Sequence, residues 1–209
     1  MKKEELETMT DLPDINDVGV PVKNGESFLQ TYTGRVISVQ NPDPKELSSS
    51  DIIHSLSLSC RFNGHCSRLY TVGDHTLNGD FIIQKMYGAF TPLRKSWFIH
   101  DFTEAYVGDV IRPVKRHLPE FKDIEKVFHN ALVKAFELEE FDEEGVHHID
   151  NYTVMWEKEY LLPKDVYWPG MPDIEWLKLP ELPTRIPQEV RKSLYKLHKE
   201  LFPEKDYWR

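Results

Sequence analysis

The sequence predicts an all-α domain with one short extended segment near its N-terminus. Apolar residues recur at three- and four-residue steps across residues 121–135, which is typical of an amphipathic helix. Capping residues at 48–51 precede a second apolar run, and Pro187 suits the first turn of a terminal helix. Only residues 28–39 combine β-branched and aromatic residues around a Thr-Gly pair, which indicates a short hairpin or extended segment.

Size and composition fit one domain with extensions and a buried core. The chain has 209 residues, 40% hydrophobic and 29% charged. Its net charge of −9 argues against a nucleic acid polymer as partner, although a local positive pocket could still bind a small phosphorylated molecule. No apolar run approaches the roughly 18 residues of a membrane span, and the polar start lacks the hydrophobic core of a signal peptide. With Cys60 and Cys66 read as reduced thiols, we expect a cytoplasmic protein and no membrane partner.

The N-terminal part is expected to begin as a loosely ordered arm and to continue into an extended segment and a helix. Residues 1–27 are polar and acidic, with prolines and glycines, so we expect a loosely ordered arm. After the extended segment, residues 41–44 force a turn, and the caps at 48–51 start a helix that reaches about Cys60. Residues 61–70 form a loop dense in hydrogen-bonding and cationic groups, and loops of this kind carry function.

Three further helices are expected before the C-terminal part. One runs from about Val72 to Tyr87, and the next begins after Thr91-Pro92 and ends at Gly108-Asp109. The acidic run at 139–144 is interpreted as a solvated loop ahead of a last core helix that starts near Val146.

The C-terminal part is expected to be irregular between Pro163 and Pro183, where prolines and tryptophans are frequent. The terminal helix has one apolar stripe that should pack against the domain or a neighbouring subunit: Val190, Leu194, Leu197 and Leu201. The predicted organisation is therefore an arm (1–27), a core domain (28–165) and an extension with a terminal helix (166–209).

The stretch from Trp97 to Asp109 has the most chemical content. It begins apolar and then presents His100 and Asp101 side by side, with Glu104 three and four residues further on. On a helix, residues at these spacings share one face. An imidazole nitrogen next to a carboxylate oxygen suits Zn, Mn, Co or Fe, so the segment predicts part of a metal site.

Two more candidate ligands, His75 and Asp150, lie on other predicted core helices. The order His, then His-Asp, then Asp resembles the HD-domain metal phosphohydrolases. Four segments resemble motifs of that family. Val72–Thr76 resembles V-x-E-H-S, and His100–Asp109 resembles H-D-x-S-E-x-x-x-G-D. Arg112–Lys115 resembles P-x-K, and Glu159–Pro163 resembles the E-x-x-L-x-P tail that follows the last aspartate.

The resemblance spans residues 28–165 and is strongest to bacterial 5′-deoxynucleotidases and a related phage group that includes dATP triphosphohydrolases. Residues 30–35 and 61–65 look more like the phage group. The sequence departs from the pattern at Asp74, where Glu is usual, and at Lys95-Ser96, which interrupts the apolar residues that normally precede the His-Asp pair.

The family resemblance implies an HD-domain helical bundle with a short extended N-terminal segment and an irregular C-terminal extension. It also implies one divalent transition metal (Co, Mn or Zn) held by His75, His100, Asp101 and Asp150, with Mg able to accompany substrate phosphates. Relatives are dimers or rings of dimers, so a homo-oligomer is expected, in the host cytoplasm if the chain is phage-encoded.

The remaining polar residues near these ligands receive roles from their chemistry. Glu104 could orient or deprotonate an attacking water or protonate the leaving oxygen, and Asp109 would assist it or fix its position. Arg61, Arg112 and Lys115 are the nearest cations for a phosphate.

Two residues of the 61–70 loop are assigned to the substrate. Phe62 could stack on a base, which the resemblance supports because an Arg-aromatic pair in this loop contacts the nucleotide in relatives. His65 either contacts substrate or makes hydrogen bonds within the loop.

The expected function is metal-dependent hydrolysis of a deoxynucleotide. A dNTP (dATP) triphosphohydrolase of the phage type is favoured, and a 5′-deoxynucleotidase that releases phosphate from dNMPs is the alternative. A catalytically silent nucleotide-binding HD module and a cyclic-nucleotide phosphodiesterase, which needs ligands for a second metal, remain as further alternatives.

Overall fold

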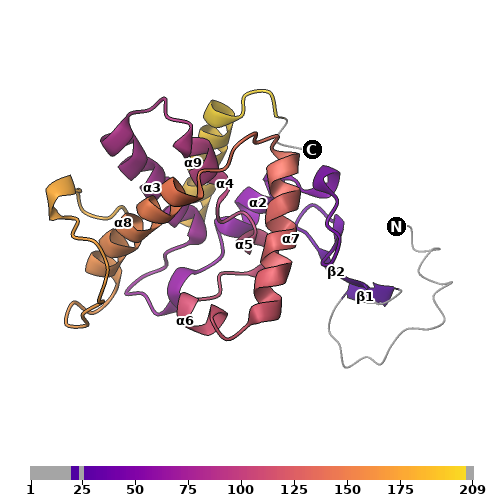
Figure 1. The fold of residues 1–209 in the computed structure, drawn as a ribbon, viewed down its shortest axis with the longest axis horizontal. Helices are drawn as coiled ribbons and strands as arrows, with labels where there is room; N and C mark the ends of the chain where they lie inside the picture. Colours follow the sequence, from indigo (N-terminus) through magenta and orange to yellow (C-terminus); the bar gives the residue numbers. More distant parts are fainter. Residues whose placement is uncertain (1–19, 24–25, 206–209) are drawn as a thin grey trace.

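The computed structural model describes residues 20–23 and 26–205 (Figure 1). Within this part of the chain the protein is mostly helical, so the predicted helical character is confirmed. Its α-helices are α2 (Ser49–Leu56), α3 (Val72–Tyr87), α4 (Leu93–Ile99), α5 (Glu104–Val107), α6 (Arg112–Lys115), α7 (Pro119–Ala135), α8 (Glu143–Leu161) and α9 (Pro187–Leu201). Short 3₁₀ turns are η1 (Pro44–Glu46), η2 (Arg61–Gly64) and η3 (Glu175–Leu177). None of the helices in the described ranges is both long and apolar enough to cross a membrane.

A small antiparallel sheet lies at one side of the helical body (Figure 1). Its strands are β1 (Val20–Lys23), β2 (Glu26–Gln30) and β3 (Val36–Ser38), in the order β1-β2-β3. The extended N-terminal segment is therefore present. However, β1 and the start of β2 fall inside the expected arm and are paired strands, because Val20 aligns with Phe28. The rest of that arm, residues 1–19 and 24–25, lies outside the described residues.

The turn between β2 and β3 is tied to α2 by one buried carboxylate. Asp51, in the first turn of α2, accepts hydrogen bonds from the backbone N–H and hydroxyl of Thr33, at 2.7 and 2.8 Å, and from the hydroxyl of Thr31, at 2.9 Å. The Thr-Gly segment that resembles the phage group therefore has a structural role here, because it fixes the sheet to the helices.

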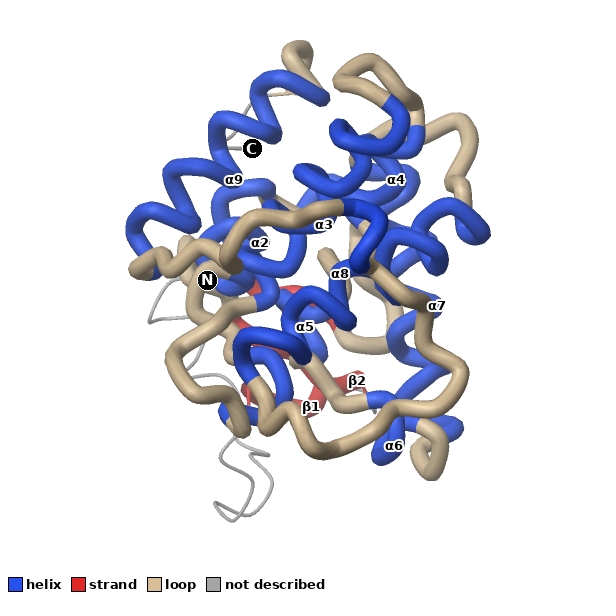
Figure 2. Tube along the Cα trace, turned by 90° about the vertical axis from the view of Figure 1, so that its left-hand side faces the viewer, coloured by secondary structure: helices blue, strands red, loops and turns tan. Residues whose placement is uncertain are grey.

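Helix α3 is central to the core and packs against α4, α8 and α9 (Figures 1 and 2). A tight approach between α3 and α4 depends on Gly79, where a Cβ would lie 1.9 Å from Cζ2 of Trp97. The indole N–H of Trp97 donates to the carbonyl of Thr76 at 2.8 Å. This close packing brings the first turn of α3 near the end of α4.

Helix α9 belongs to the same core rather than to a separate extension. It packs on α2, α3 and α4, and Figure 2 shows it beside α2 and α3. Its apolar stripe is buried within the chain: Val190, Leu194, Leu197 and Leu201. The stripe therefore packs against the domain, and it is not available as a subunit interface. The expected homo-oligomer stays a prediction.

Some helix boundaries match those expected from the sequence and others differ. Helix α3 has the predicted bounds, and the segment after Pro163 is irregular apart from η3. Helix α2 stops at Leu56 rather than near Cys60, and Leu58 is exposed. Helix α8 starts inside the acidic run because the Asp142 side chain accepts the N–H of Gly145 and caps it.

Candidate metal centre

The expected single helix around His100 is instead broken in two. Helix α4 ends at Ile99 and α5 begins at Glu104, with residues 100–103 in a tight turn. Its backbone hydrogen bonds span three residues. The N–H of Phe102 donates to the carbonyl of Ile99, and the N–H of Glu104 donates to the carbonyl of Asp101. This tighter winding places His100 and Asp101 at a helix end.

The orientation of His100 follows from its neighbours. Its Nδ1 lies 2.5 Å from the carbonyl oxygen of Trp97, and its ring stacks on that indole with centroids 4.0 Å apart. A carbonyl can only accept, so Nδ1 carries the proton and Nε2 has the free lone pair. His100 is therefore set up to bind a cation through Nε2.

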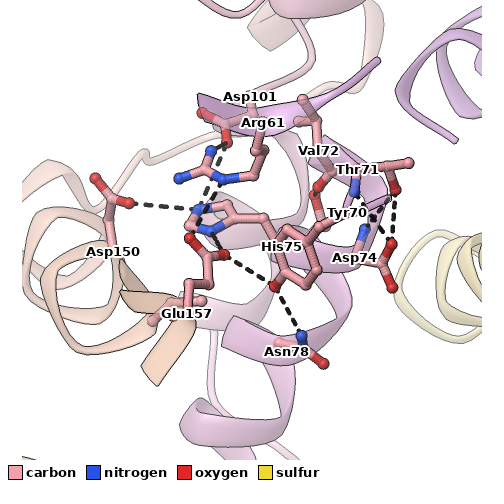
Figure 3. Close-up of polar contacts among 12 residues, drawn as sticks. Arg61, Tyr70, Thr71, Val72, Asp74, His75, Asn78, Asp101, Asp150 and Glu157 are labelled. Carbon is pink, nitrogen blue, oxygen red and sulfur yellow. Dashed lines mark hydrogen bonds and ion pairs between the residues drawn. The ribbon is translucent and has the colours of Figure 1, made fainter. Parts of the chain in front are cut away.

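His75 is oriented in the same way from the first turn of α3. That turn begins with a capping box between Thr71 and Asp74, so the unusual Asp74 serves as a helix cap. His75 is fully buried, and its Nδ1 lies 2.6 Å from a carboxylate oxygen of Glu157. Its Nε2 points toward Asp101 and Asp150, at 3.6 and 3.3 Å (Figure 3).

Three of the four predicted ligands form a compact cluster. Donor atoms of His75, His100 and Asp101 all lie within 4.8 Å of one another, and His100 Nε2 is 3.1 Å from Asp101 Oδ2. Both Nε2 atoms and Asp101 Oδ2 are buried and have no hydrogen-bond partner within the described part of the chain. Burying such atoms unpaired is costly. Two imidazole nitrogens and a carboxylate oxygen fit a divalent metal, so this group could hold one.

Asp150 adjoins the cluster from α8 but has a second partner. One of its oxygens is 3.3 Å from His75 Nε2, and the other is contacted by Arg112. Burial would raise the pKa of Asp150, but the close contact with His75 and its charge, together with Arg112, hold it well below its usual value. Asp150 therefore remains ionised and beside the cluster, with Arg112 on its other side.

The ionisation of the other ligands depends on the same charges. Burial raises the pKa of Asp101, but His100, His75 and Arg61 outweigh burial and lower it to about 2. Burial and Arg61 lower the pKa of His75, but Glu157 and Asp150 outweigh them and raise it to about 9. A metal that binds here must therefore displace a proton from His75.

A cavity of about 520 Å³ opens beside the cluster and is lined by both predicted catalytic acids, Glu104 and Asp109. Glu104 is buried, and its Oε2 has no hydrogen-bond partner among residues 20–23 and 26–205. Burial, with the negative charges of Asp101 and Asp109, raises the pKa of Glu104 well above its usual value. Burial also raises the pKa of Asp109, although the positive charge of Arg61 lowers it in part.

Predicted cationic groups line the cavity, but each is engaged by a carboxylate. Arg61 is buried, and its guanidinium lies 3.3 Å from Glu157 and 3.8 Å from Asp101. Arg112 is half-exposed and contacts Asp150, and Lys115 Nζ is 2.7 Å from Glu125. Arg116 also lines the cavity, and the sequence analysis did not single it out.

The loop predicted to bind substrate contributes Phe62 but not His65. His65 is exposed and lies outside the cavity lining, so the structure does not bring it to the site. Phe62 lines the cavity with a φ of 53°, followed by Asn63 at 51° and Gly64 at 75°. Positive φ is uncommon for a bulky residue and costs free energy, which is typical of backbone held in place at functional sites.

Glu157 is a second site residue that sequence reasoning missed. It is 0% exposed and accepts from Tyr70 at 2.9 Å, besides its contacts with His75 and Arg61 (Figure 3). The sequence analysis emphasised Glu159, which is exposed. The available signal was spacing, because residue 157 lies seven positions after Asp150 and so shares its helix face.

Comparison with known proteins finds relatives but no named activity. No family model matches the chain. It is 30% identical over 153 residues to the uncharacterized protein YfdR of Escherichia coli, which covers 71% of this chain and 83% of YfdR. It is 29% identical over 96 residues to the uncharacterized protein RCAP_rcc00048 of Rhodobacter capsulatus, covering 43% of this chain and about half (47%) of that relative.

Proposed function

This chain belongs to the family of the Escherichia coli protein YfdR, and we propose that it is an HD-domain phosphohydrolase that uses one divalent transition metal to hydrolyse deoxynucleotides. The observation that carries the proposal is the convergence of unpartnered buried donor atoms of His75, His100 and Asp101 beside a cavity that contains two further acids and several cations. A structural role alone leaves these three buried atoms without a hydrogen bond.

The metal would be Co, Mn or Zn, held by His75, His100, Asp101 and Asp150. When bound, a divalent ion supplies charge neutralisation at a phosphoryl oxygen and activates water as a nucleophile. The residues of the chain prepare this site, because Trp97 and Glu157 fix the two imidazoles with their Nε2 atoms directed into it. Mg could accompany the substrate phosphates.

Glu104 is the proposed proton-transfer group. It lines the cavity, and its raised pKa suits a carboxyl that exchanges a proton with attacking water or with the leaving oxygen. Asp109 lies in the same cavity, and its negative charge contributes to the raised pKa of Glu104. Hydrolysis then needs only water as co-reactant, since one P–O bond breaks as another forms.

Arg112 and Lys115 are the proposed phosphate partners. Arg112 is half-exposed, so a phosphate could compete with Asp150 for its guanidinium. Arg61 is more deeply buried and paired with Glu157 and Asp101, so we assign it mainly to holding the site together. Phe62 is the proposed contact for the base.

The favoured reaction is release of tripolyphosphate from a dNTP such as dATP, supported by the resemblance of residues 61–65 to the phage group. The alternative is release of phosphate from dNMPs. A nucleotide-binding module without turnover is the third reading.

One experiment separates these three. The purified chain is incubated with each common dNMP and dNTP in the presence of Mn²⁺, Co²⁺ or Zn²⁺, and inorganic phosphate and tripolyphosphate are measured separately. The favoured function predicts tripolyphosphate and deoxynucleoside from a dNTP, and no turnover by the Asp101→Ala variant. Phosphate from dAMP with no reaction on dATP would establish the alternative. A raised melting temperature with nucleotide but no hydrolysis would contradict both.

A further inference from the structure

The cavity beside the metal centre has two chemically different linings. One is the set of acids and cations described above. The other is apolar. It combines Val110, Pro113 and Val154 with three side chains from the segment after α8: Trp168, Pro169 and Met171. A metal and a phosphate need none of these apolar groups. A volume of about 520 Å³ is within the range of small-molecule sites, so the apolar lining has room for the rest of a ligand.

The segment that carries Trp168 is stiff. Pro169 follows the tryptophan, Gly170 has a φ of 78°, and Pro172 follows the turn. Proline fixes its own φ and restricts the residue before it, and a left-handed glycine after a proline is what a type II turn requires. The segment therefore holds a defined conformation without being a helix or a strand.

The indole of Trp168 is held at the cavity by its neighbours. The ammonium of Lys158, on α8, lies 5.9 Å from the centre of the ring, within reach of a cation–π interaction. The side chain is only partly buried. A tryptophan in a stiff turn, partly exposed at a cavity wall, has ring surface left for a ligand.

The segment is also anchored to the core further along. Leu177 and Leu182 are 2% and 3% exposed, and the indole N–H of Trp156 donates to the carbonyl of Pro180 at 3.0 Å. Arg68, which follows the Phe62 loop, donates to the carbonyls of residues 182 and 183. The wall is therefore a fixed part of the cavity.

We propose that Trp168, supported by Pro169 and Met171, forms the wall against which the nucleobase of the substrate stacks, in addition to the contact proposed for Phe62. This inference rests on the proposed function, because it assigns the apolar lining to the part of a deoxynucleotide that carries no phosphate. A nucleobase presents a flat aromatic face, and stacking on an aromatic side chain binds it with little dependence on which base it is. The subsite lies in residues 166–209, beyond the part of the chain that resembles the HD-domain enzymes.

The test measures binding of 2′-deoxyadenosine to the Mn²⁺-loaded protein by calorimetry. Both candidate reactions release a deoxynucleoside, and it is not consumed, so turnover does not interfere. Trp168→Ala should weaken its binding by about 10-fold or more, and Trp168→Phe should restore most of it. Trp176→Ala is the matched control, because Trp176 is in the same segment but is 56% exposed and outside the cavity lining. Inorganic phosphate should bind all variants equally.

Unchanged deoxyadenosine binding in Trp168→Ala, or equal losses in Trp176→Ala, would overturn the inference. Melting curves show whether each variant folds, and if Trp168→Ala does not, Met171→Ala is measured in its place and should weaken deoxyadenosine but not phosphate. The two proposals fail separately. Deoxyadenosine binding through Trp168 without any hydrolysis of nucleotides removes the proposed function alone, whereas hydrolysis with an unchanged KM in Trp168→Ala removes the subsite alone.

Discussion

Replacing Glu157 by glutamine tests whether the metal centre depends on the residue behind His75. The carboxylate makes three contacts at 0% exposure: 2.6 Å to His75 Nδ1, 2.9 Å to the Tyr70 hydroxyl and 3.3 Å to Arg61 Nε. One oxygen accepts from His75 and Tyr70, and the other faces Arg61. Glutamine has the same shape but only one acceptor oxygen, so it cannot satisfy both sides.

Either orientation of the glutamine amide has a cost. With its NH₂ toward His75, the amide donates to Nδ1, moves the ring proton to Nε2 and blocks the lone pair that a metal needs. With its NH₂ toward Arg61, two donors face each other in a buried site. Loss of such a histidine partner typically lowers metal affinity by about 10- to 100-fold, or roughly 1.4–2.7 kcal/mol. The unsatisfied contact should also lower the free energy of unfolding by about 1–3 kcal/mol.

The assay is calorimetric titration of Mn²⁺ or Co²⁺ into the metal-free protein, together with thermal melting. Glu159→Gln is the matched control, since it removes the same charge two residues further along α8 at an exposed position. It should change neither quantity. NMR of ¹⁵N-labelled histidine adds a direct measure of which His75 nitrogen carries the proton. Wild-type metal affinity in Glu157→Gln would refute the reasoning.

Three further outcomes follow from the same structure. Glu104→Gln should lower kcat by about 10²- to 10⁴-fold while metal affinity stays near wild type, and a variant that retains full turnover would remove Glu104 from the chemistry. Arg112→Gln should tighten Mn²⁺ binding in calorimetry, because Arg112 no longer competes for Asp150, and should raise KM; weaker metal binding would contradict this. Burial lowers the pKa of His198 from 6.5 to about 4, so the unfolded chain binds its proton first as pH falls and stability is lost between those values. Denaturant unfolding at pH 7 and pH 5 should show about 2 kcal/mol of this loss in the wild type and none of it in His198→Gln; equal losses in both proteins would exclude His198 as the cause.

Helices with long apolar periodicity were predictable because one packing face repeats along them. The existence of α7 and α9 follows from that pattern. The break at residues 100–103 did not follow, since apolar spacing is the same whether hydrogen bonds span three residues or four. Strand β1 was missed although Asn24-Gly25, a strong hairpin sequence, separates two short runs with strand-forming residues.

The candidate site shows the same division between what the chain order specifies and what tertiary packing adds. Residue type and order predicted His75, His100 and Asp101, and the structure brings donor atoms of these three residues together. The charges in the sequence did not predict which carboxylate pairs with each arginine, since several carboxylates were available to Arg61 and Arg112. Those pairings depend on distances across helices that are far apart in sequence. They matter chemically, because the carboxylate that contacts Arg61 also orients His75, so we expect the affinity for metal and the placement of the buried guanidinium to depend on one residue.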